Sequence, residues 1–494
     1  MSDMTTTARV PSMFGRVFAY EARLLWADRS LWAVCGLLAL LLGYSLLNGI
    51  GELAPRQRVL AGIESQQIER ERANAASLRR VLAGKEKPEP FANPADPASI
   101  GGGMGARSAV LPYPALAPLA VGQSDMQPNY YRVTAGSKSK FLYDGELENP
   151  WNLLSGSFDL AFVVVYLLPL AICALCWNLL SAEREQGTLR LLLSQPLTLF
   201  TLVAGKVALR VAALLGTLLL VVPLVLLAAQ PAARTGPALA LLGAALALVV
   251  GYALFWFAFA VAVNALGRSS AFNALVLIAG WVLIVLVLPV VLNLVVSVAS
   301  PAPSRTELAT RTRLVTIAGL NRYNKLLSTD YRYVDRPDTL LPRDGKIEVA
   351  PRLRAFYLMG RDTDREIDTL LQRFDAQLAG QQALVDRWSW LSPAIVVHEG
   401  LAALAGTGSA RYALFKQQVD VFHAEWKAFF EPRLLAGTAI TPDDLVRLPR
   451  FGWVEQDPAA VWAGWLRGCA QLCLPALALA LFARRRLRRY AVVA

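Results

Sequence analysis

Residues 236–300 read GPALALLGAALALVVGYALFWFAFAVAVNALGRSSAFNALVLIAGWVLIVLVLPVVLNLVVSVAS and contain one charged side chain, Arg268. A helix needs about 20 apolar residues to cross the hydrocarbon core of a bilayer. The stretch is therefore long enough for two crossings, 236–266 and 269–299, joined by a short basic turn. This pattern excludes an ordinary soluble protein and predicts a chain built around membrane-spanning helices.

Four further apolar windows lie outside this stretch, at 31–50, 158–180, 207–229 and 462–483. Together the six windows predict an all-α polytopic membrane protein with six transmembrane helices. Pro169, Pro223, Pro289 and Pro475 fall inside the windows. Prolines are tolerated in spanning helices because neighbouring groups satisfy the freed carbonyls, and they mark expected kinks.

The composition is uneven along the chain, with 55% hydrophobic and 17% charged residues overall. Soluble domains carry about 25% charged residues. Two long segments, 51–157 and 300–461, nevertheless have a soluble composition. The net charge of +12 is not concentrated in them, because each insertion is close to neutral. A nucleic-acid-binding domain needs a basic face, so we expect no nucleic-acid partner.

The two insertions are predicted to pack together as one mainly α-helical extracytoplasmic cap. A helical stretch from Glu52 to Ala83 follows the first span, and the proline-rich residues 88–128 are expected to be irregular. In the second insertion, apolar and aromatic residues recur at helical spacing between residues 412 and 429. This stripe fits a packed core better than a path for lipid or peptide, and His423 within it fits a packed or capping residue better than a ligand.

Basic residues near the short loops predict the orientation of the spans. Arginines and lysines gather on the side of both termini, including the tail 484–494, as expected for cytoplasmic flanks. The predicted chain thus crosses its membrane several times, with both termini cytoplasmic. Residues 1–30 are expected to hold an interfacial amphipathic helix, whose marked residues are Phe14, Phe18, Glu21 and Arg23.

The cytoplasmic segment 181–206 joins the second and third spans. Glu183 and Glu185 precede Gly187, which can break the descending helix. Thr188 is expected to cap a new short helix, and Gly205-Lys206 is expected to open the next span. The short helix would carry an apolar face of Leu189, Leu192 and Leu193 and would end at Pro196.

This order of residues resembles the coupling segment of type-2 ABC permeases, the membrane subunits of ATP-driven exporters. The leader Phe18-x-Tyr20-Glu21-x-Arg23 resembles that family's interfacial helix. Residues 149–162, 391–408 and 422–432 are similar to the branch with two large extracytoplasmic loops, which includes permeases of nitrous-oxide-reductase maturation and gliding motility. The resemblance assigns ATPase coupling to Glu183, Arg184, Glu185, Gly187, Thr188, Leu189, Leu192, Leu193 and Pro196.

The resemblance implies a non-catalytic permease subunit in a bacterial inner (cytoplasmic) membrane. It would be paired with a second permease as a homo- or heterodimer and docked on a separate ABC ATP-binding subunit. ATP and Mg would be bound by that partner, with no cofactor in this chain. The chain itself departs from a Walker motif, since Val207 follows Gly205-Lys206 and Phe200 stands where the first motif glycine belongs. Membrane lipid, and a possible extracytoplasmic client protein, complete the expected partners.

Two other functions remain open from the residues. The spans contain few polar groups, which also fits a mechanotransmitting subunit that acts on an extracytoplasmic partner without moving cargo. Gly267-Arg268-Ser269 resembles the G-x-S of an intramembrane hydrolase, which is the other alternative. However, no histidine lies in a span to act as the base for the serine. The Cys173–Cys176 pair is expected to be apolar filler, and two histidines make a metal site improbable on composition.

Overall fold

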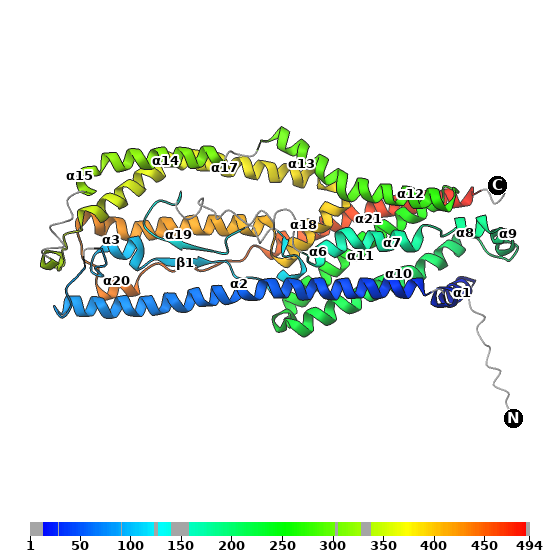
Figure 1. Cartoon of the computed structure of the whole chain (residues 1–494), viewed down its shortest axis with the longest axis horizontal. Coiled ribbons are helices and arrows are strands. Elements are labelled where there is room, and N and C mark those ends of the chain that lie inside the picture. The colour runs from blue at the N-terminus through cyan, green and yellow to red at the C-terminus, as the bar shows by residue number, and fades with distance from the viewer. Residues whose placement is uncertain are drawn as a thin grey trace, which may run out of the picture.

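The computed structural model describes residues 13–27, 29–89, 91–122, 127–139, 158–301, 305–327 and 337–490. These residues form an elongated molecule in which long helices run roughly parallel to one axis (Figure 1). Six helices are long and apolar enough to cross a membrane, so the chain has the character of a multi-pass membrane protein. They gather in one half of the molecule, and the second half, here called the distal half, is built from the two insertions.

The candidate spans agree closely with the six predicted windows. Two of them contain π-helical segments, each followed by a proline, Pro169 or Pro289. The spans are α2 (Ser30–Leu82), α6–η4–α7 (Leu160–Phe162, Val163–Leu167, Leu168–Cys176), α10 (Leu199–Ala229), α11 (Gly236–Asn264), α12–η6–α13 (Ser270–Trp281, Val282–Val287, Leu288–Ala299) and α21 (Pro458–Arg488). A 3₁₀ turn, η5 (Pro231–Arg234), joins α10 to α11.

The first predicted window continues into the helical stretch predicted after it. The span 31–50 and the stretch from Glu52 to Ala83 form one 53-residue helix, α2, which runs into the distal half. Pro55 lies inside it. Gly49 approaches Pro118 closely, since a Cβ there would lie 2.8 Å from the Pro118 carbonyl oxygen. Gly49 therefore allows α2 to pack closely against Pro118 of the first insertion.

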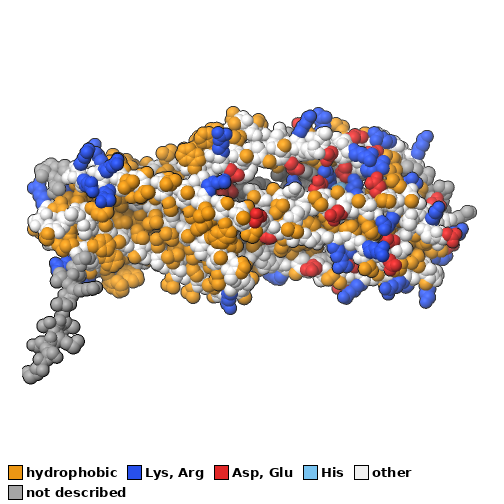
Figure 2. Space-filling model, turned by 180° about the vertical axis from the view of Figure 1, so that it is seen from behind, with side chains coloured by type: hydrophobic (Ala, Val, Ile, Leu, Met, Phe, Trp, Pro, Cys, Tyr) orange, Lys and Arg blue, Asp and Glu red, His pale blue; other side chains and the backbone are white. Residues whose placement is uncertain are grey.

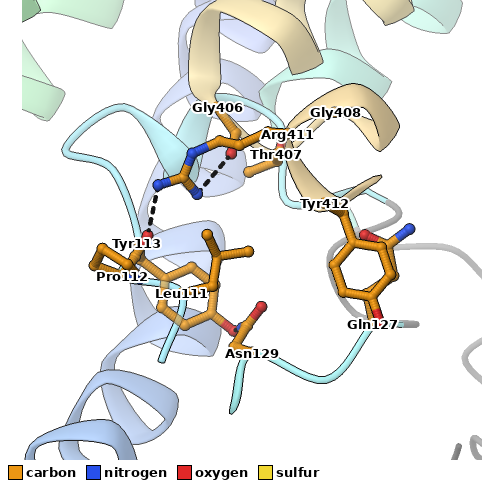
Figure 3. A pocket seen from close by; sticks show the side chains of 10 residues that line it. All are labelled: Leu111, Pro112, Tyr113, Gln127, Asn129, Gly406, Thr407, Gly408, Arg411 and Tyr412. Carbon is orange, nitrogen blue, oxygen red and sulfur yellow. Dashed lines mark hydrogen bonds between the residues drawn. The ribbon is translucent and has the colours of Figure 1, made fainter. Parts of the chain in front are cut away.

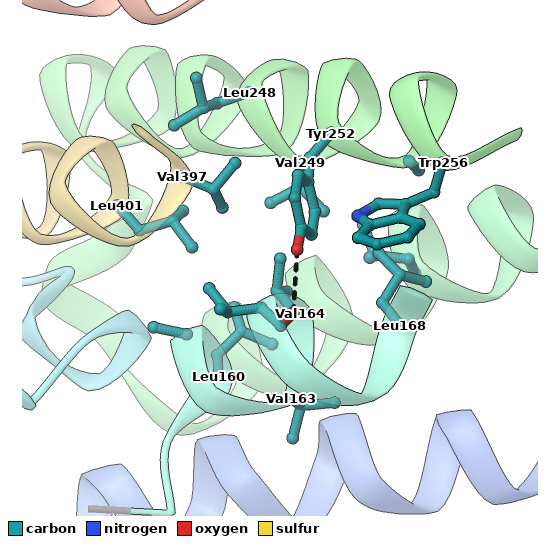
Figure 4. Close-up of a cluster of buried hydrophobic side chains, with 14 of the residues drawn as sticks. Leu160, Val163, Val164, Leu168, Leu248, Val249, Tyr252, Trp256, Val397 and Leu401 are labelled. Carbon is teal, nitrogen blue, oxygen red and sulfur yellow. Dashed lines mark hydrogen bonds between the residues drawn. The ribbon is translucent and has the colours of Figure 1, made fainter. Parts of the chain in front are cut away.

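The core of the bundle is formed around α11, whose buried side chains contact the helices on either side (Figure 4). Tyr252 of α11 donates a hydrogen bond of 2.9 Å to the carbonyl of Val165 in η4. That carbonyl lies four residues before Pro169, which has no N–H to offer it. The carbonyl freed by Pro169 is thus satisfied by a hydroxyl from a neighbouring helix.

A short apolar helix of the second insertion, α18 (Pro393–Ala405), also belongs to this core. Val397 and Leu401 pack with Leu248 of α11 (Figure 4). Ser392 caps α18 and also donates a 3.1 Å hydrogen bond to the carbonyl of Ile284, five residues before Pro289 in the π-helical segment η6. The insertion is therefore joined to the bundle by packing and by a backbone contact inside a span.

The distal half is mainly helical, as predicted, and its described residues include a two-stranded antiparallel sheet in which Arg107 pairs with Val133. Its remaining elements are α3 (Pro97–Ser99), η1 (Ile100–Met104), β1 (Arg107–Val110), η2 (Ala117–Leu119), β2 (Tyr130–Val133), α14 (Arg305–Arg322), α15 (Asn324–Leu327), η7 (Pro337–Leu340), α17 (Pro351–Trp388), η8 (Ser389–Leu391), α19 (Ser409–Ala436) and α20 (Pro442–Val446).

Both insertions contribute to one distal core, which confirms that they pack together. The aromatic stripe of α19 lies in this core, with Phe415 and Trp426 fully buried, so the packing interpretation is correct. His423 is also buried, and its Nε2 lies 2.9 Å from the carbonyl oxygen of Gly136. The proline-rich stretch is better packed than predicted: where the structure describes it, it contains β1, and Ile100 is fully buried.

The surface divides into the same two halves. Seen from behind, apolar side chains cover the half that contains the spans, whereas acidic and basic side chains gather over the distal half (Figure 2). Apolar cover is expected where helices meet acyl chains, and mixed charge where they meet water. Arginine and lysine side chains also appear at the outer end of the spans.

Candidate functional site

The residues marked by sequence for coupling lie at the end of the bundle opposite the distal half. Here α1 (Met13–Ala27), α8 (Ser181–Glu185), α9 (Thr188–Leu193) and the end of α21 come together (Figure 1). We call residues 181–198 the elbow. The predicted short helix between the second and third spans is therefore present, and it lies at the same end as both α1 and the last residues of α21.

Gly187 forms the corner of the elbow. Its φ angle is +73°, a left-handed conformation that glycine adopts at little cost. It occupies the N-cap position of α9, so our assignment of the cap to Thr188 was wrong. Thr188 is instead the first helical residue, and its hydroxyl donates a 3.3 Å hydrogen bond to the carbonyl of Glu183. The corner thus depends on backbone freedom at Gly187.

The elbow ends earlier than predicted. Helix α9 ends at Leu193, before Pro196, and α10 begins at Leu199, with Thr198 capping it by accepting from the Thr201 N–H at 3.1 Å. We had placed the start of this helix at Gly205-Lys206. Both residues lie instead in its second turn, where Gly205 allows close contact with α1. A Cβ at Gly205 would lie 2.6 Å from Cγ1 of Val17.

The inner side of α9 packs against several spans. Leu189 is buried, and Leu192 and Leu193 are partly buried. They belong to a cluster that also includes Val17, Leu202, Val203, Ala262, Ala265, Ala483 and Leu487. These residues come from α1, α10, the end of α11 and the end of α21. A displacement of α9 would therefore press on four helices through van der Waals contacts, since packed interiors deform little.

A cluster of four charged side chains joins the elbow to α1 and α10. Lys206 forms ion pairs with Glu183 and with Glu21, the latter at 3.3 Å, and Arg210 Nη1 lies 3.4 Å from Glu21 Oε2. Glu21 is 3% exposed and Lys206 4%. The two acids and two bases balance, which offsets part of the cost of removing charge from water.

This cluster adds a contact that the prediction of an interfacial helix did not include. The sequence marked Glu21 as a residue of an amphipathic helix and did not indicate that Glu21 would be buried. In the structure, Val17, Glu21 and Leu25 recur every four residues on the face toward α10. Arg23 is exposed on the opposite side. Phe14 lies three residues before Val17 on the same side but is exposed, and Phe18 is partly buried, with its ring 6.5 Å from that of Phe14.

The second carboxylate of α8 holds a different span. Glu185 accepts hydrogen bonds from the Ser270 N–H at 2.7 Å and from its hydroxyl at 2.9 Å. Ser270 opens α12, so this contact fixes the elbow to the fifth span. Ser181 Oγ lies 2.7 Å from Ser270 Oγ and 3.4 Å from the amide of Asn273. Asn273 in turn donates to Asn264 of α11 at 3.2 Å.

Arg184 lies between these two acids in sequence and contacts a third segment of the bundle. Its guanidinium donates to the carbonyl of Gly267, in the turn that joins α11 to α12. Glu183, Arg184 and Glu185 therefore contact α10, the α11–α12 turn and α12 respectively. Three successive residues of one helical turn connect the elbow to the ends of three spans.

The outer side of the elbow is left exposed. Leu191 is 73% exposed, and Gln186, Thr188 and Arg190 are exposed beside it. Pro196 is exposed as well. The arrangement suits a docking surface, because the inner side transmits contacts into the bundle while the outer side presents an apolar residue and a cation.

Sequence reasoning missed Arg210 and Ser270 as members of this site, and it placed Lys206 only at the start of the next span. Two cations four residues apart at the start of an apolar run were the available signal, since such residues lie on one face of a helix. Glu21 carried a similar signal, because it stands four residues from both Val17 and Leu25. No sequence pattern indicated which acid would pair with which cation.

The residues that the sequence offered for catalysis or metal binding have structural roles in the described part of the chain. Ser269 caps α12 by accepting from the Phe272 N–H at 3.3 Å, so it does not resemble a nucleophile. Cys173 and Cys176 are free and buried in a span. Across the described ranges, no group of three or more His, Cys, Asp or Glu side chains is placed to hold a metal ion.

A small pocket in the distal half is lined by residues that bond to neighbouring parts of the chain (Figure 3). Arg411 points into it and is held by both oxygens of Glu455, at 2.7 and 2.9 Å, and by the carbonyl of Pro112 at 3.0 Å. Burial alone would raise the pKa of Glu455, but hydrogen bonds from Arg411 and Trp453 hold that pKa below its usual range. The guanidinium is therefore a structural clamp.

Comparison with known protein families found a match in the second insertion. A domain of unknown function (DUF3526) matches residues 352–454, which cover nearly all of α17 and extend through α18, α19 and α20. No curated protein and no solved structure matches the chain. The matched region covers about a fifth of the sequence and contains no elbow residue.

Proposed function

We propose that this chain is the membrane-spanning permease subunit of an ATP-binding cassette transporter of the export type. ATP hydrolysis would occur in a separate subunit docked on the elbow. The subunit itself would be non-catalytic, would work as a dimer with a second permease, and would lie in a bacterial inner membrane with both termini cytoplasmic.

The observation that carries this proposal is the branching of contacts from α8. Glu183 pairs with Lys206 of α10, and Glu185 binds Ser270 of α12. A force applied to the exposed side of α9 would therefore reach two spans through charged hydrogen bonds, which are stronger than neutral ones. Helix α1 would move with them, because Glu21 pairs with Lys206.

The direct test is copurification from the native membrane after mild detergent extraction. We expect an ATP-binding cassette ATPase, identified by mass spectrometry, to copurify with the full chain. Leu191→Arg should reduce its recovery by about tenfold, because the substitution places a charge in the interface. Val446→Arg, at a position 76% exposed in the distal half, is the matched control. Equal recovery of the ATPase from both variants would contradict docking on the elbow.

A second candidate function is a mechanotransmitter that acts on an extracytoplasmic client and moves no cargo. Two contacts favour it: α2 runs unbroken from the bundle into the distal half, and Ser392 at the start of α18 binds the Ile284 carbonyl inside a span. Motion of the bundle would then be passed outward by rigid elements.

Photo-crosslinking separates the two functions. Photoreactive residues placed along α11 and α12 should capture cargo during ATP turnover if the chain transports it. Crosslinks that form only from the distal half, to a protein client, would favour the mechanotransmitter. Copurification of the ATPase is expected in both cases. Photo-crosslinking therefore distinguishes transport from mechanotransmission and does not test coupling to the ATPase.

A further inference from the structure

Helix α21 ends in a dense run of arginines. Arg484, Arg485, Arg486, Arg488 and Arg489 are all exposed. Within the part of the chain that the structure describes, none of them forms an ion pair with a carboxylate. Five cations without intramolecular counter-ions call for an anionic partner, because clustered like charges repel one another.

The arginines share a face with side chains that point away from the bundle. Leu477, Leu481, Arg484 and Arg488 follow one another at spacings of four, three and four residues, so they lie on one side of the helix. Both leucines are exposed, whereas Leu487 is buried against the bundle. In a spanning helix, the exposed leucines contact acyl chains. Arg484 and Arg488 therefore lie directly below the lipid that contacts Leu477 and Leu481.

The length of the apolar stretch places the first arginine near the headgroups. Residues 468–483 contain no charged side chain. At a rise of about 1.5 Å per residue, this stretch spans about 24 Å, less than the roughly 30 Å of a hydrocarbon core. Arg467 at one end and Arg484 at the other must therefore extend toward the interfaces, as long basic side chains do.

Arg484 is also held at a defined position. Its guanidinium carbon lies 5.6 Å from the ring centre of Phe200, in the first turn of α10. The exposed phenyl ring thus positions the cation at the seam between α10 and α21. A guanidinium stacked on a ring keeps its N–H groups available, and their planar arrangement matches two phosphate oxygens.

We propose that the end of α21, with Phe200 of α10, is a binding site for the phosphate headgroups of anionic phospholipids. A lipid partner is favoured over an acidic protein because the arginines continue the face of Leu477 and Leu481. A protein bound there would have to lie beside the helix at the level of the membrane. The inference rests on the spanning of α21 and not on ATP-driven transport.

Lipid selectivity of the full chain, reconstituted without any ATPase, tests the site. Spin-labelled phosphatidylglycerol and phosphatidylcholine report, by electron paramagnetic resonance, the fraction of each lipid that is immobilised by the protein. We expect phosphatidylglycerol to be preferred by about two- to fourfold at low salt, and the preference to fall in 1 M NaCl. The variant Arg484→Gln/Arg485→Gln/Arg488→Gln/Arg489→Gln should lose most of it.

The control variant removes four exposed arginines of the distal half, Arg72, Arg79, Arg313 and Arg354, by the same change to Gln. It should keep the preference, which excludes an effect of net charge alone. Equal selectivity of the α21 variant and the wild type overturns the proposal. It is also overturned if the α21 variant keeps its lipid selectivity but no longer copurifies with the ATPase, because the arginines would then belong to a protein interface.

Discussion

Lys206 Nζ lies 3.3 Å from Glu21 Oε1, although one residue stands in a candidate span and the other in the short helix α1 that precedes the first span. Both side chains are buried, and Lys206 also pairs with Glu183 of the elbow. One lysine thereby connects the leader helix, the elbow and the third span. The contact explains how three segments far apart in sequence can move as a unit.

Removal of one charge from this cluster should be costly. Glu21→Gln leaves Lys206 and Arg210 with one acid between them, and we expect a loss of about 3 kcal/mol in the free energy of unfolding. The double variant Glu21→Gln/Lys206→Met restores the balance of one acid and one base and should recover part of this loss. Thermal unfolding in detergent measures both effects.

Arg23 supplies the matched control for this cluster, because it lies on the exposed side of the same helix. Arg23→Gln should change stability by no more than about 0.5 kcal/mol. The loss in the free energy of unfolding for the double variant could instead exceed the sum of the losses for Glu21→Gln and Lys206→Met. In that case the balance of charge would not be what stabilises the cluster.

Any residue other than glycine at position 187, the corner of the elbow, should reduce stability. Gly187→Ala forces an L-residue to a φ angle of +73° and should destabilise the elbow by about 1 kcal/mol. Gly62→Ala is the control, because Gly62 lies inside α2 with open space around its Cα. That change should be neutral or stabilising. Hydrogen exchange of α9 amides, followed by mass spectrometry, should report faster exchange only for the Gly187 variant.

Contact between α1 and α10 depends on another glycine. Gly205→Ala would place a methyl group 2.6 Å from Val17, so α1 must shift outward. We expect Leu25→Cys, a buried position on the same face of α1, to react faster with a maleimide in the Gly205→Ala background. Gly216→Ala, in the same helix with no atom within 4 Å of the added methyl, should leave the rate unchanged. Equal rates in both backgrounds would mean that α1 is not packed on α10.

The distal half should be sensitive to pH through Asp96. Burial raises the pKa of this carboxyl group to about 7, although it caps α3 by accepting from the Ala98 N–H at 2.8 Å. A folded-state pKa above the unfolded value means that stability is greatest below pH 4 for this group and declines as pH rises through about 7. The decline should amount to no more than about 4 kcal/mol.

Asp96→Asn keeps a capping oxygen and removes the titration. Compared with wild type, it should gain relative stability between pH 5 and pH 8, as measured by urea unfolding at each pH. Asp457→Asn changes an exposed cap with the same geometry, since Asp457 accepts from the Ala459 N–H at 2.9 Å. Its profile should run parallel to that of wild type. Parallel profiles for both variants would exclude Asp96 as the source of the pH dependence.

The long-range order of the fold could be predicted from sequence because charge-free stretches as long as residues 236–300 have few alternatives to spanning helices. Gly187 could be identified as a corner because glycine stands between a charged turn and a leucine patch. Local details were less accessible. The close approach of Gly49 to Pro118 is a tertiary contact that no local pattern records. The cap at Thr198 is a local bond to the Thr201 N–H, and it was missed because the start of the helix was assigned to Gly205-Lys206.

The buried charge cluster was the main feature that sequence could not supply. Glu21 appears as one more polar residue of an amphipathic helix, and its burial follows only once Lys206 and Arg210 lie on the facing side of α10. Pairing between α1 and α10 joins residues nearly 190 positions apart, at 3.4 Å for Arg210 and Glu21. Periodicity within one helix contains no information about such a partner.

Site-directed labelling of Leu191→Cys tests the central claim most directly, in a background where the five native cysteines are replaced by alanine. The account predicts that a membrane-impermeant maleimide labels this residue in inside-out vesicles and not in intact spheroplasts, whereas Val446→Cys shows the reverse. It further predicts that Leu191→Cys forms a crosslink to an ATP-hydrolysing subunit. Labelling of Leu191→Cys from outside the cell, with no crosslink to such a subunit, would contradict the account.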